Sequence, residues 1–407
     1  MEENRKNAVY VGSFDPITWG HLAIIIDILT VYDEVIIAVG SNPEKEKSLF
    51  SGKYRIELIR IALEELVDSF DYRYLTGREY SQAEIMAISR LRKNPNIVKV
   101  MGFDGMTVDF AIRNHVDTII RGERIVGDHD VETKLSMMNK MLCDVRRVHL
   151  NKHQITVPQE KLTYISSSSA KEFALMHEYA AAANFVTPRV LNLLTAKYLR
   201  QDFRKLCDTF GIDEMDKIDD LWFDLRRVYL PRRAYPLSFV GYCLNYLNIY
   251  CRNYQKVENY LLVKAALYYA YYNAENGNEA VCECQKASRR LSCYLKRGEQ
   301  EKIENLIAAL RLPNNDKLPD ADDDLLHDVT TVIYGDKNNF GTFAFQLLLG
   351  RCGLSTEKDY ARKRVEYLNS LLSEKDLYRL DYFRDNFSDD AGWNLRQEKA
   401  YWQSVLE

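Results

Sequence analysis

The stretch GSFDPITWGH, residues 12–21, gathers several groups that can bind an anion. It follows a short apolar run and holds Ser13, Thr18 and His21 beside two glycines. Gly20 and His21 open a helical pattern, and the free backbone N–H groups at a helix start bind phosphate oxygens. A histidine there can also donate to a phosphate oxygen as negative charge develops on it. A strand-to-helix turn with a capping histidine explains the same residues equally well.

A second helix start is predicted in YISSSSAKE, residues 164–172, where four serines precede a helical pattern. Serine is a common N-cap, so this stretch alone indicates only that a helix begins here. Beside the first loop, it would supply a second helix N-terminus able to hold the far phosphates of a nucleotide.

Cations follow two of the predicted strands. In IIRGERIVGDHDVE, Arg121 and Arg124 flank a glycine at a strand end, and arginines at that position are expected to hold phosphates. The alternative is a surface ion pair with Glu123 or Asp128. Lys45, in SNPEKEKSLF, adds a further positive charge to the same edge.

The elements that position these residues follow from hydrophobic periodicity. Up to about residue 199, short β-branched runs alternate with helical patterns, which predicts an α/β fold with a doubly wound parallel sheet buried on both faces. Ligands of such sheets bind at the carboxyl ends of the strands, where the first loop lies. The predicted strands are residues 8–12, 34–40, 96–103, 116–122 and 145–151.

The pattern changes to long helical periods after about residue 200. The sequence therefore predicts two domains, an α/β domain over residues 1–199 and an all-helical domain over residues 200–407. The tyrosine-rich run LYYAYY within the second domain is interpreted as a core helix stripe.

Composition limits the classes of function. The 407 residues carry a formal net charge of -4, which argues against a nucleic-acid partner. The beginning of the chain lacks an apolar signal region and no segment is apolar for about 18 residues, so we expect a cytoplasmic protein without a membrane partner. The eight cysteines form no C-x-x-C pair and are read as reduced thiols, with no protein-bound metal expected.

Five motifs in order closely resemble the bacterial phosphopantetheine adenylyltransferases, of the T/H-x-G-H nucleotidyltransferases. They are GSFDPITWGH, NPEKEKSLF, DFAIRNH, IIRGERIVGDHDVE with MMNKML, and YISSSSAKE, and the resemblance covers residues 7–199. It implies that ATP and 4'-phosphopantetheine react to give dephospho-coenzyme A and pyrophosphate, with Mg²⁺. It also implies a homo-oligomer.

The resemblance implies roles for particular residues. His21 would bind ATP and stabilise the transition state, with Thr18, Lys45 and Arg124 as further catalytic groups. Binding of 4'-phosphopantetheine would involve Ser13, Lys45, Thr107 and Arg121. The implied ATP site comprises Ser13, Phe14, His21, Gly122, Glu123, Arg124, Glu132, Leu162, Thr163, Tyr164, Ile165, Ser166, Ser167 and Ser168.

The chain also departs from the pattern of that family. Ser13 replaces the commoner threonine, and Glu123 stands at a usually apolar position. The segment around Lys45 is one residue longer than typical, so Lys47 is an alternative for its role. About 25 residues, roughly 69–94, are inserted before the third predicted strand and could change the oligomer.

The helical half more faintly resembles the HD-type phosphohydrolases, without their ligands. Pro236 and Val240 stand where that family has histidines, and its HD doublet falls near Tyr269 and Ala270. His327 is the only histidine after residue 177, and one imidazole cannot build such a metal site. We therefore expect a non-catalytic domain for assembly or regulation.

Two other functions remain open for the chain as a whole. One is adenylyl transfer to another acceptor such as nicotinamide mononucleotide, although enzymes of that type usually carry H-x-G-H where this chain has Thr18. The other is a nucleotide-binding scaffold without catalysis.

Overall fold

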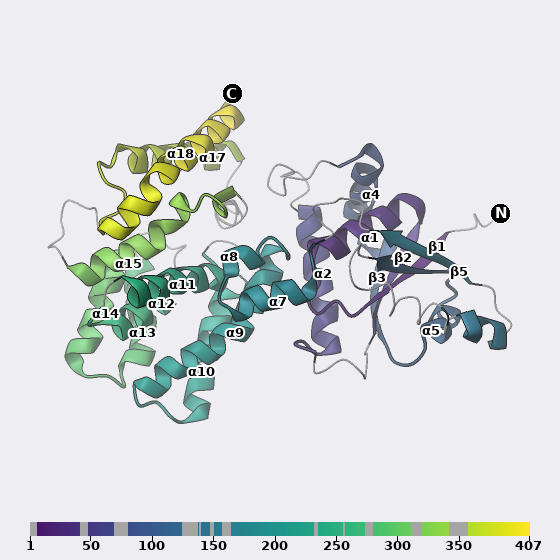
Figure 1. The fold of residues 1–407 in the computed structure, drawn as a ribbon, viewed down its shortest axis with the longest axis horizontal. Helices are drawn as coiled ribbons and strands as arrows, with labels where there is room; N and C mark the ends of the chain where they lie inside the picture. Colours follow the sequence, from purple (N-terminus) through teal and green to yellow (C-terminus); the bar gives the residue numbers. More distant parts are fainter. Residues whose placement is uncertain are drawn as a thin grey trace. The chain divides into compact units, whose positions relative to one another are not determined.

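The computed structural model divides the chain into two compact units, seen in Figure 1. We call Met1–Glu172 with Asn184–Val190 the sheet unit, and Phe173–Ala183 with Leu191–Glu407 the helical unit. The predicted domain boundary at residues 199 and 200 falls within helix α9 (Pro188–Thr209). The structure describes residues 6–40, 48–68, 80–123, 137, 140–146, 150–156, 164–231, 235–254, 257–272, 280–310, 320–341 and 357–407.

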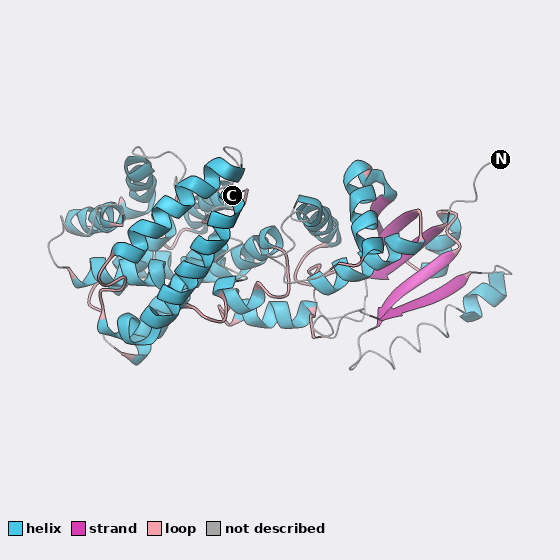
Figure 2. Ribbon diagram, turned by 90° about the horizontal axis from the view of Figure 1, so that it is seen from above, coloured by secondary structure: helices cyan, strands magenta, loops and turns pink. Residues whose placement is uncertain are grey.

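The sheet unit is built on five parallel strands in the order β3-β2-β1-β4-β5, drawn in magenta in Figure 2. In the central register, Val9 lies opposite Ile36 on one side and Ile119 on the other. The strands are β1 (Asn7–Gly12), β2 (Glu34–Gly40), β3 (Val98–Phe103), β4 (Thr118–Glu123) and β5 (Asn151–Thr156).

Helices cover both faces of this sheet, which confirms the predicted doubly wound α/β class. Helix α5 (Thr107–Arg113) packs on the face that carries Val9, Ile36 and Ile119, together with Cys143 from a helical segment over residues 140–146. Helices α1 (Trp19–Val31) and α2 (Gly52–Asp68) cover the opposite face (Figure 1). Helix α7 (Ser167–Leu175) begins in this unit.

The fifth predicted strand, over residues 145–151, is wrong. Residues 140–146 are helical, with Val145 77% exposed and Arg146 paired with Asp109 of α5. The strand begins only at Asn151 and reads NKHQIT. Because β5 is an edge strand, its sequence does not need the apolar character of a central strand, and the apolar run before it was mistaken for it.

The third predicted strand also needs two corrections. Residues Pro95–Ile97 form a 3-10 turn, favoured because a proline at the first helical position loses no hydrogen bond, so β3 starts at Val98. Only Val98 of β3 is fully buried, and Met101 is 37% exposed. As an edge strand, β3 is not buried on both faces.

The insertion contributes a packed helix to the sheet unit. Residues 69–79 lie outside the described residues, and α4 (Gln82–Lys93) follows them, capped by Ser81 and Glu84. The guanidinium of Arg90 donates to the backbone carbonyl oxygens of Leu29, Tyr32 and Asp33, at distances of 3.1 to 3.3 Å. The inserted helix thus binds the carboxyl end of α1.

The described part of the helical unit contains helices and no strand, as predicted. The interpretation of the tyrosine-rich run as core is confirmed for residues 267–270, which are buried, whereas Tyr271 and Tyr272 follow the end of α12 and are half-buried. No described helix of the chain combines the length and the apolar character that a membrane span requires. The helices are α8 (Tyr179–Ala182), α9, α10 (Met215–Tyr229), α11 (Leu237–Asn253), α12 (Tyr260–Tyr269), α13 (Ala280–Ser292), α14 (Arg297–Ala309), α15 (Ala321–Thr331), α17 (Glu357–Ser373) and α18 (Asp381–Leu406), with a short 3-10 turn η6 (Val332–Gly335).

Candidate active site

The strand order places a switch point between β1 and β4. The chain leaves β1 for β2 and β3 on one side of the sheet and returns to β4 and β5 on the other. Ligands of open parallel sheets bind beyond the carboxyl ends of the strands at such a point. The loop Gly12–His21 follows β1, and Arg121 to Glu123 end β4, so the two predicted phosphate-binding stretches meet at this edge.

Thr18 and His21 form the N-terminal cap of α1. The backbone N–H of Thr18 donates to Nδ1 of His21 at 3.0 Å, and the hydroxyl of Thr18 lies 2.8 Å from the same nitrogen. The backbone N–H of His21 donates in turn to Thr18 Oγ1 at 3.4 Å. Because an amide N–H can only donate, Nδ1 is an acceptor, and the neutral ring carries its proton on Nε2. His21 is therefore both the capping residue of one interpretation and an oriented N–H donor.

Phe14 fixes the other side of the His21 ring. Its own ring is fully buried, 5.0 Å from His21 and 5.3 Å from Tyr10 between centroids, both in edge-on geometry. The backbone of Phe14 is left-handed, with φ of 48°. A Cβ atom at Gly12 would approach the Phe14 ring to 2.8 Å, so glycine is required for the ring to fold back over the strand end.

The end of β4 is also shaped by a close approach. A Cβ atom on Gly122 would lie 2.5 Å from Ile24 of α1 and 3.1 Å from the hydroxyl oxygen of Tyr10. Arg121, which precedes it, is half-buried at the carboxyl edge. Thr107, also predicted to bind the acceptor, is buried at the first turn of α5.

The serine run forms a helix start, as predicted, and contacts the first loop. Ser166 accepts the backbone N–H of Ser169 at 2.9 Å and so caps α7. The hydroxyl of Ser167 donates to the carbonyl oxygen of Pro16 at 2.7 Å, which joins α7 to the loop that carries His21. Of the neighbouring residues predicted to line the ATP site, Tyr164 and Ser168 are exposed and Ile165 is half-buried.

Three residues that hold this arrangement together were missed in the sequence. Arg55 is buried and donates to the carbonyl oxygens of Ser13 (2.6 Å) and Gly40 (3.3 Å), at the ends of β1 and β2. Asp15 accepts hydrogen bonds from the chain after β2 and pairs with Lys171 of α7 at 3.4 Å. Asp15 and Lys171 stand in the quoted motifs, whereas no local signal distinguishes Arg55 from other residues of an amphipathic helix.

Several predicted site residues lie outside the described part of the chain. They are Lys45 with its alternative Lys47, Arg124, Glu132, Leu162 and Thr163. Glu123 is described only as the last backbone position of β4, so neither its side chain nor the alternative ion pair with Arg121 or Arg124 is placed.

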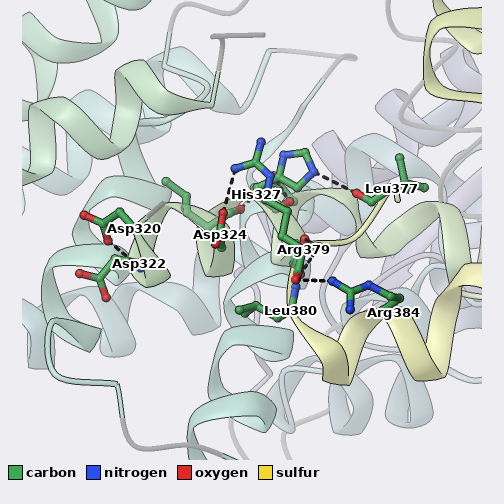
Figure 3. Close-up of polar contacts among 11 residues, drawn as sticks. Asp320, Asp322, Asp324, His327, Leu377, Arg379, Leu380 and Arg384 are labelled. Carbon is green, nitrogen blue, oxygen red and sulfur yellow. Dashed lines mark hydrogen bonds and ion pairs between the residues drawn. The ribbon is translucent and has the colours of Figure 1, made fainter. Parts of the chain in front are cut away.

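In the helical unit, the four positions compared in the sequence with the HD-type ligands are placed by the structure. Val240, Tyr269 and Ala270 are buried core residues, and Pro236 is the N-cap of α11. His327 lies with its Nε2 3.1 Å from the carbonyl oxygen of Leu377, as Figure 3 shows. Among the described residues, no group of three or more histidine, cysteine and acidic side chains is arranged to hold a metal ion.

Asp328, beside His327, is a buried cap. Its carboxylate accepts the backbone N–H groups of Arg379 and Leu380, just before α18, with a shortest distance of 2.7 Å. The Arg379 guanidinium lies 3.3 Å from Asp324 (Figure 3). Burial raises the pKa of Asp328 to about 7, against the opposing effect of these two backbone donors.

Comparison with known proteins places the sheet unit. Residues 9–173 match the cytidylyltransferase-like family. Phosphopantetheine adenylyltransferase from Desulfitobacterium hafniense is 35% identical over 192 residues, which cover 47% of this chain and 94% of that protein. The Legionella pneumophila (strain Lens) phosphopantetheine adenylyltransferase is 34% identical over 207 residues, covering 51% of this chain and 98% of the relative.

A solved structure of Plasmodium falciparum nicotinic acid mononucleotide adenylyltransferase complexed with NaAD aligns with 49% of this chain and 98% of its own, at 17% identity and a TM-score of 0.26. The sequence relatives, matched over nearly their whole length, decide the classification. Through its N-terminal half, the chain belongs to the phosphopantetheine adenylyltransferase family within the cytidylyltransferase-like nucleotidyltransferases.

Proposed function

We propose that the sheet unit transfers the adenylyl group of ATP to 4'-phosphopantetheine, giving dephospho-coenzyme A and pyrophosphate. The observation that carries this proposal is the cap of α1, where Thr18 orients His21 at the switch point of the sheet. The acceptor is inferred from the named relatives, which share about a third of their residues with this half of the chain.

The reaction needs positioning and charge stabilisation more than a protein nucleophile. A phosphate oxygen of the acceptor attacks the α-phosphorus of ATP, and the bond from that phosphorus to the bridging oxygen breaks to release pyrophosphate. Negative charge grows on the nonbridging and leaving oxygens. The Nε2–H of His21, fixed by the acceptor role of Nδ1, is the donor that we assign to this charge.

Other residues of the carboxyl edge receive binding roles in the same proposal. Arg121, Thr107 and Ser13 would hold the acceptor, while α7, started by Ser166 and Ser167, would face ATP. Mg²⁺ would be bound through the phosphate oxygens of ATP, which are ligands of the kind that this ion prefers.

Pyrophosphate release tests the proposal directly. The full chain is incubated with ATP, Mg²⁺ and, in parallel, 4'-phosphopantetheine, nicotinamide mononucleotide or nicotinic acid mononucleotide. We expect pyrophosphate release only in the reaction that contains 4'-phosphopantetheine as the acceptor. Release only with a mononucleotide would transfer the assignment to that acceptor, and ATP binding without release in any reaction would favour a scaffold.

For the helical unit we propose a non-catalytic role in assembly or regulation, in a homo-oligomer. This proposal is supported by the contacts of His327 and Asp328. The ring of His327 lies at hydrogen-bond distance from a backbone carbonyl oxygen and Asp328 accepts two backbone N–H groups, so both side chains take part in the packing of the unit. The full chain is assayed with Mn²⁺ or Mg²⁺ and phosphate esters, and light scattering gives its subunit number. Metal-dependent phosphate release that Asp328→Ala abolishes would contradict this role.

A further inference from the structure

Asp15 connects three segments of the sheet unit through one carboxylate. The residue is 6% exposed and stands in the loop between β1 and α1. Oδ2 accepts the backbone N–H of Leu49 at 2.8 Å, and Oδ1 accepts that of Phe50 at 3.0 Å. Oδ2 also lies 3.4 Å from Nζ of Lys171. Both oxygens are therefore occupied by donors from outside the loop.

The segments that meet at Asp15 are those expected to face the two substrates. Leu49 and Phe50 close the stretch that follows β2, in which Lys45 is assigned to the acceptor. Lys171 lies in α7, whose first turn is assigned to ATP. Ser13 and His21 of the same loop stand on either side of Asp15 in the sequence.

We propose that Asp15 is a positioning residue. It holds Leu49 and Phe50, at the end of the stretch assigned to the acceptor, and helix α7, assigned to ATP, in place relative to His21. The inference rests on the proposed function for the names of the two substrates. In-line transfer demands that both phosphates be aligned, and a displacement of about 1 Å can cost about 100-fold in rate. One carboxylate that fixes both sides acts on this alignment without touching either substrate.

The chemistry of the contacts allows the two sides to be separated. In Asp15→Asn the amide keeps one acceptor oxygen, but its NH₂ group must face the backbone N–H of either Phe50 or Leu49, donor against donor, and the neutral amide no longer forms an ion pair with Lys171. In Lys171→Met the carboxylate keeps its bonds to Leu49 and Phe50, and only the contact with α7 is lost. The first variant disturbs both segments and the second disturbs one.

The test compares these variants in the full chain. For Asp15→Asn we expect kcat to fall about 10- to 100-fold and KM to rise for both ATP and 4'-phosphopantetheine. For Lys171→Met we expect KM to rise for ATP alone. Asp33→Asn is the matched control, because the exposed Asp33 side chain also accepts a backbone N–H, that of Lys6 at 3.0 Å, but at the opposite edge of the sheet.

Hydrogen exchange and ATP calorimetry make the test independent of the acceptor. We expect the Leu49 and Phe50 amides to lose protection in Asp15→Asn and to keep it in Lys171→Met, and ATP to bind more weakly in both. If the wild type were inactive with 4'-phosphopantetheine, the proposed function would fail while these readouts still tested Asp15. Wild-type exchange and ATP affinity in Asp15→Asn, or a lower melting temperature with kinetic constants unchanged, would overturn the inference.

Discussion

Polar side chains hold loops at one edge of the sheet unit, whereas in the helical unit they are enclosed within the helix packing. At the sheet edge, Asp15, Arg55 and Ser167 each bind backbone groups of neighbouring loops and strand ends. In the helical unit, Asp336 is buried and accepts the hydroxyls of Tyr242 and Tyr246 at 2.9 and 3.2 Å. The first pattern fixes the loops around the candidate active site. The second satisfies the hydrogen-bonding groups of polar side chains that are buried in a core.

The largest effect on this comparison is expected from the buried ion pair of the helical unit. Arg364 and Glu398 are 2% and 1% exposed and share two hydrogen bonds of 2.7 and 3.0 Å. Arg364→Ala leaves the Glu398 carboxylate buried without its cation, so the free energy of unfolding should fall by about 3 to 5 kcal/mol. Urea unfolding measures it, and adenylyl transfer per folded molecule should not change.

A matched control is the exposed pair of Arg297 and Glu301, 92% and 61% exposed. Arg297→Ala should cost less than about 0.5 kcal/mol. If Arg364→Ala lowered the turnover of the folded protein, the helical unit would not be separable from the chemistry of the sheet unit.

His21→Ala should show the opposite separation, in which activity is lost and stability is largely kept. Removal of one donor to developing charge costs about 100- to 1000-fold in kcat. ATP affinity from calorimetry should change much less, because the donor matters most in the transition state. A variant that retained more than about a third of wild-type turnover would remove His21 from the mechanism.

Arg121→Ala should affect one substrate at the sheet edge. A charge-assisted contact to phosphate contributes about 1.5 to 3 kcal/mol, so KM for 4'-phosphopantetheine should rise about 10- to 100-fold. The melting temperature of the variant controls for folding. Weaker ATP binding with an unchanged KM for the acceptor would reverse the assigned role.

Asp328 in the helical unit predicts a pH dependence of stability. Its pKa is raised to about 7 in the folded chain and is about 3.9 in an unfolded one, so between these values the native state binds more protons. The free energy of unfolding should therefore fall as pH rises from about 4 to 7, by at most about 1.4 kcal/mol per pH unit. Urea unfolding of Asp328→Asn should lack this slope, and parallel pH profiles of the two proteins would contradict it.

The hydrophobic pattern predicted the central strands and the edge strand β3 to within two residues of their starts, and it failed at the other edge strand, β5. β1, β2 and β4 are apolar because neighbours cover both faces, and each was predicted within two residues of its observed start. β5 has no such requirement on its outer side, and its polar sequence carried no strand signal. Of the apolar residues before it, Val145 belongs to a helix and is exposed, and Leu150 packs against the sheet core without being part of a strand.

In the candidate site, contacts between residues close in the sequence could be predicted, and contacts between distant residues could not. Thr18 and His21 are three residues apart, so one motif contains the whole cap. Arg55 reaches Ser13 across 42 residues and Lys171 reaches Asp15 across 156. Only the folded chain brings these partners together, and a residue type such as arginine on a helix gives no indication of its target.

Helix α1 is held at both ends by hydrogen bonds to other segments of the sheet unit. At its start, Thr18 caps the first turn and the backbone N–H of Trp19 donates to the carbonyl oxygen of Phe185 at 2.9 Å. At its far end, about 20 Å away for 13 residues, Arg90 of the inserted helix grips the last carbonyl groups. The inserted helix α4 thus restrains the carboxyl end of the helix whose first turn holds His21. A change in α4 would therefore act on the position of His21 through α1.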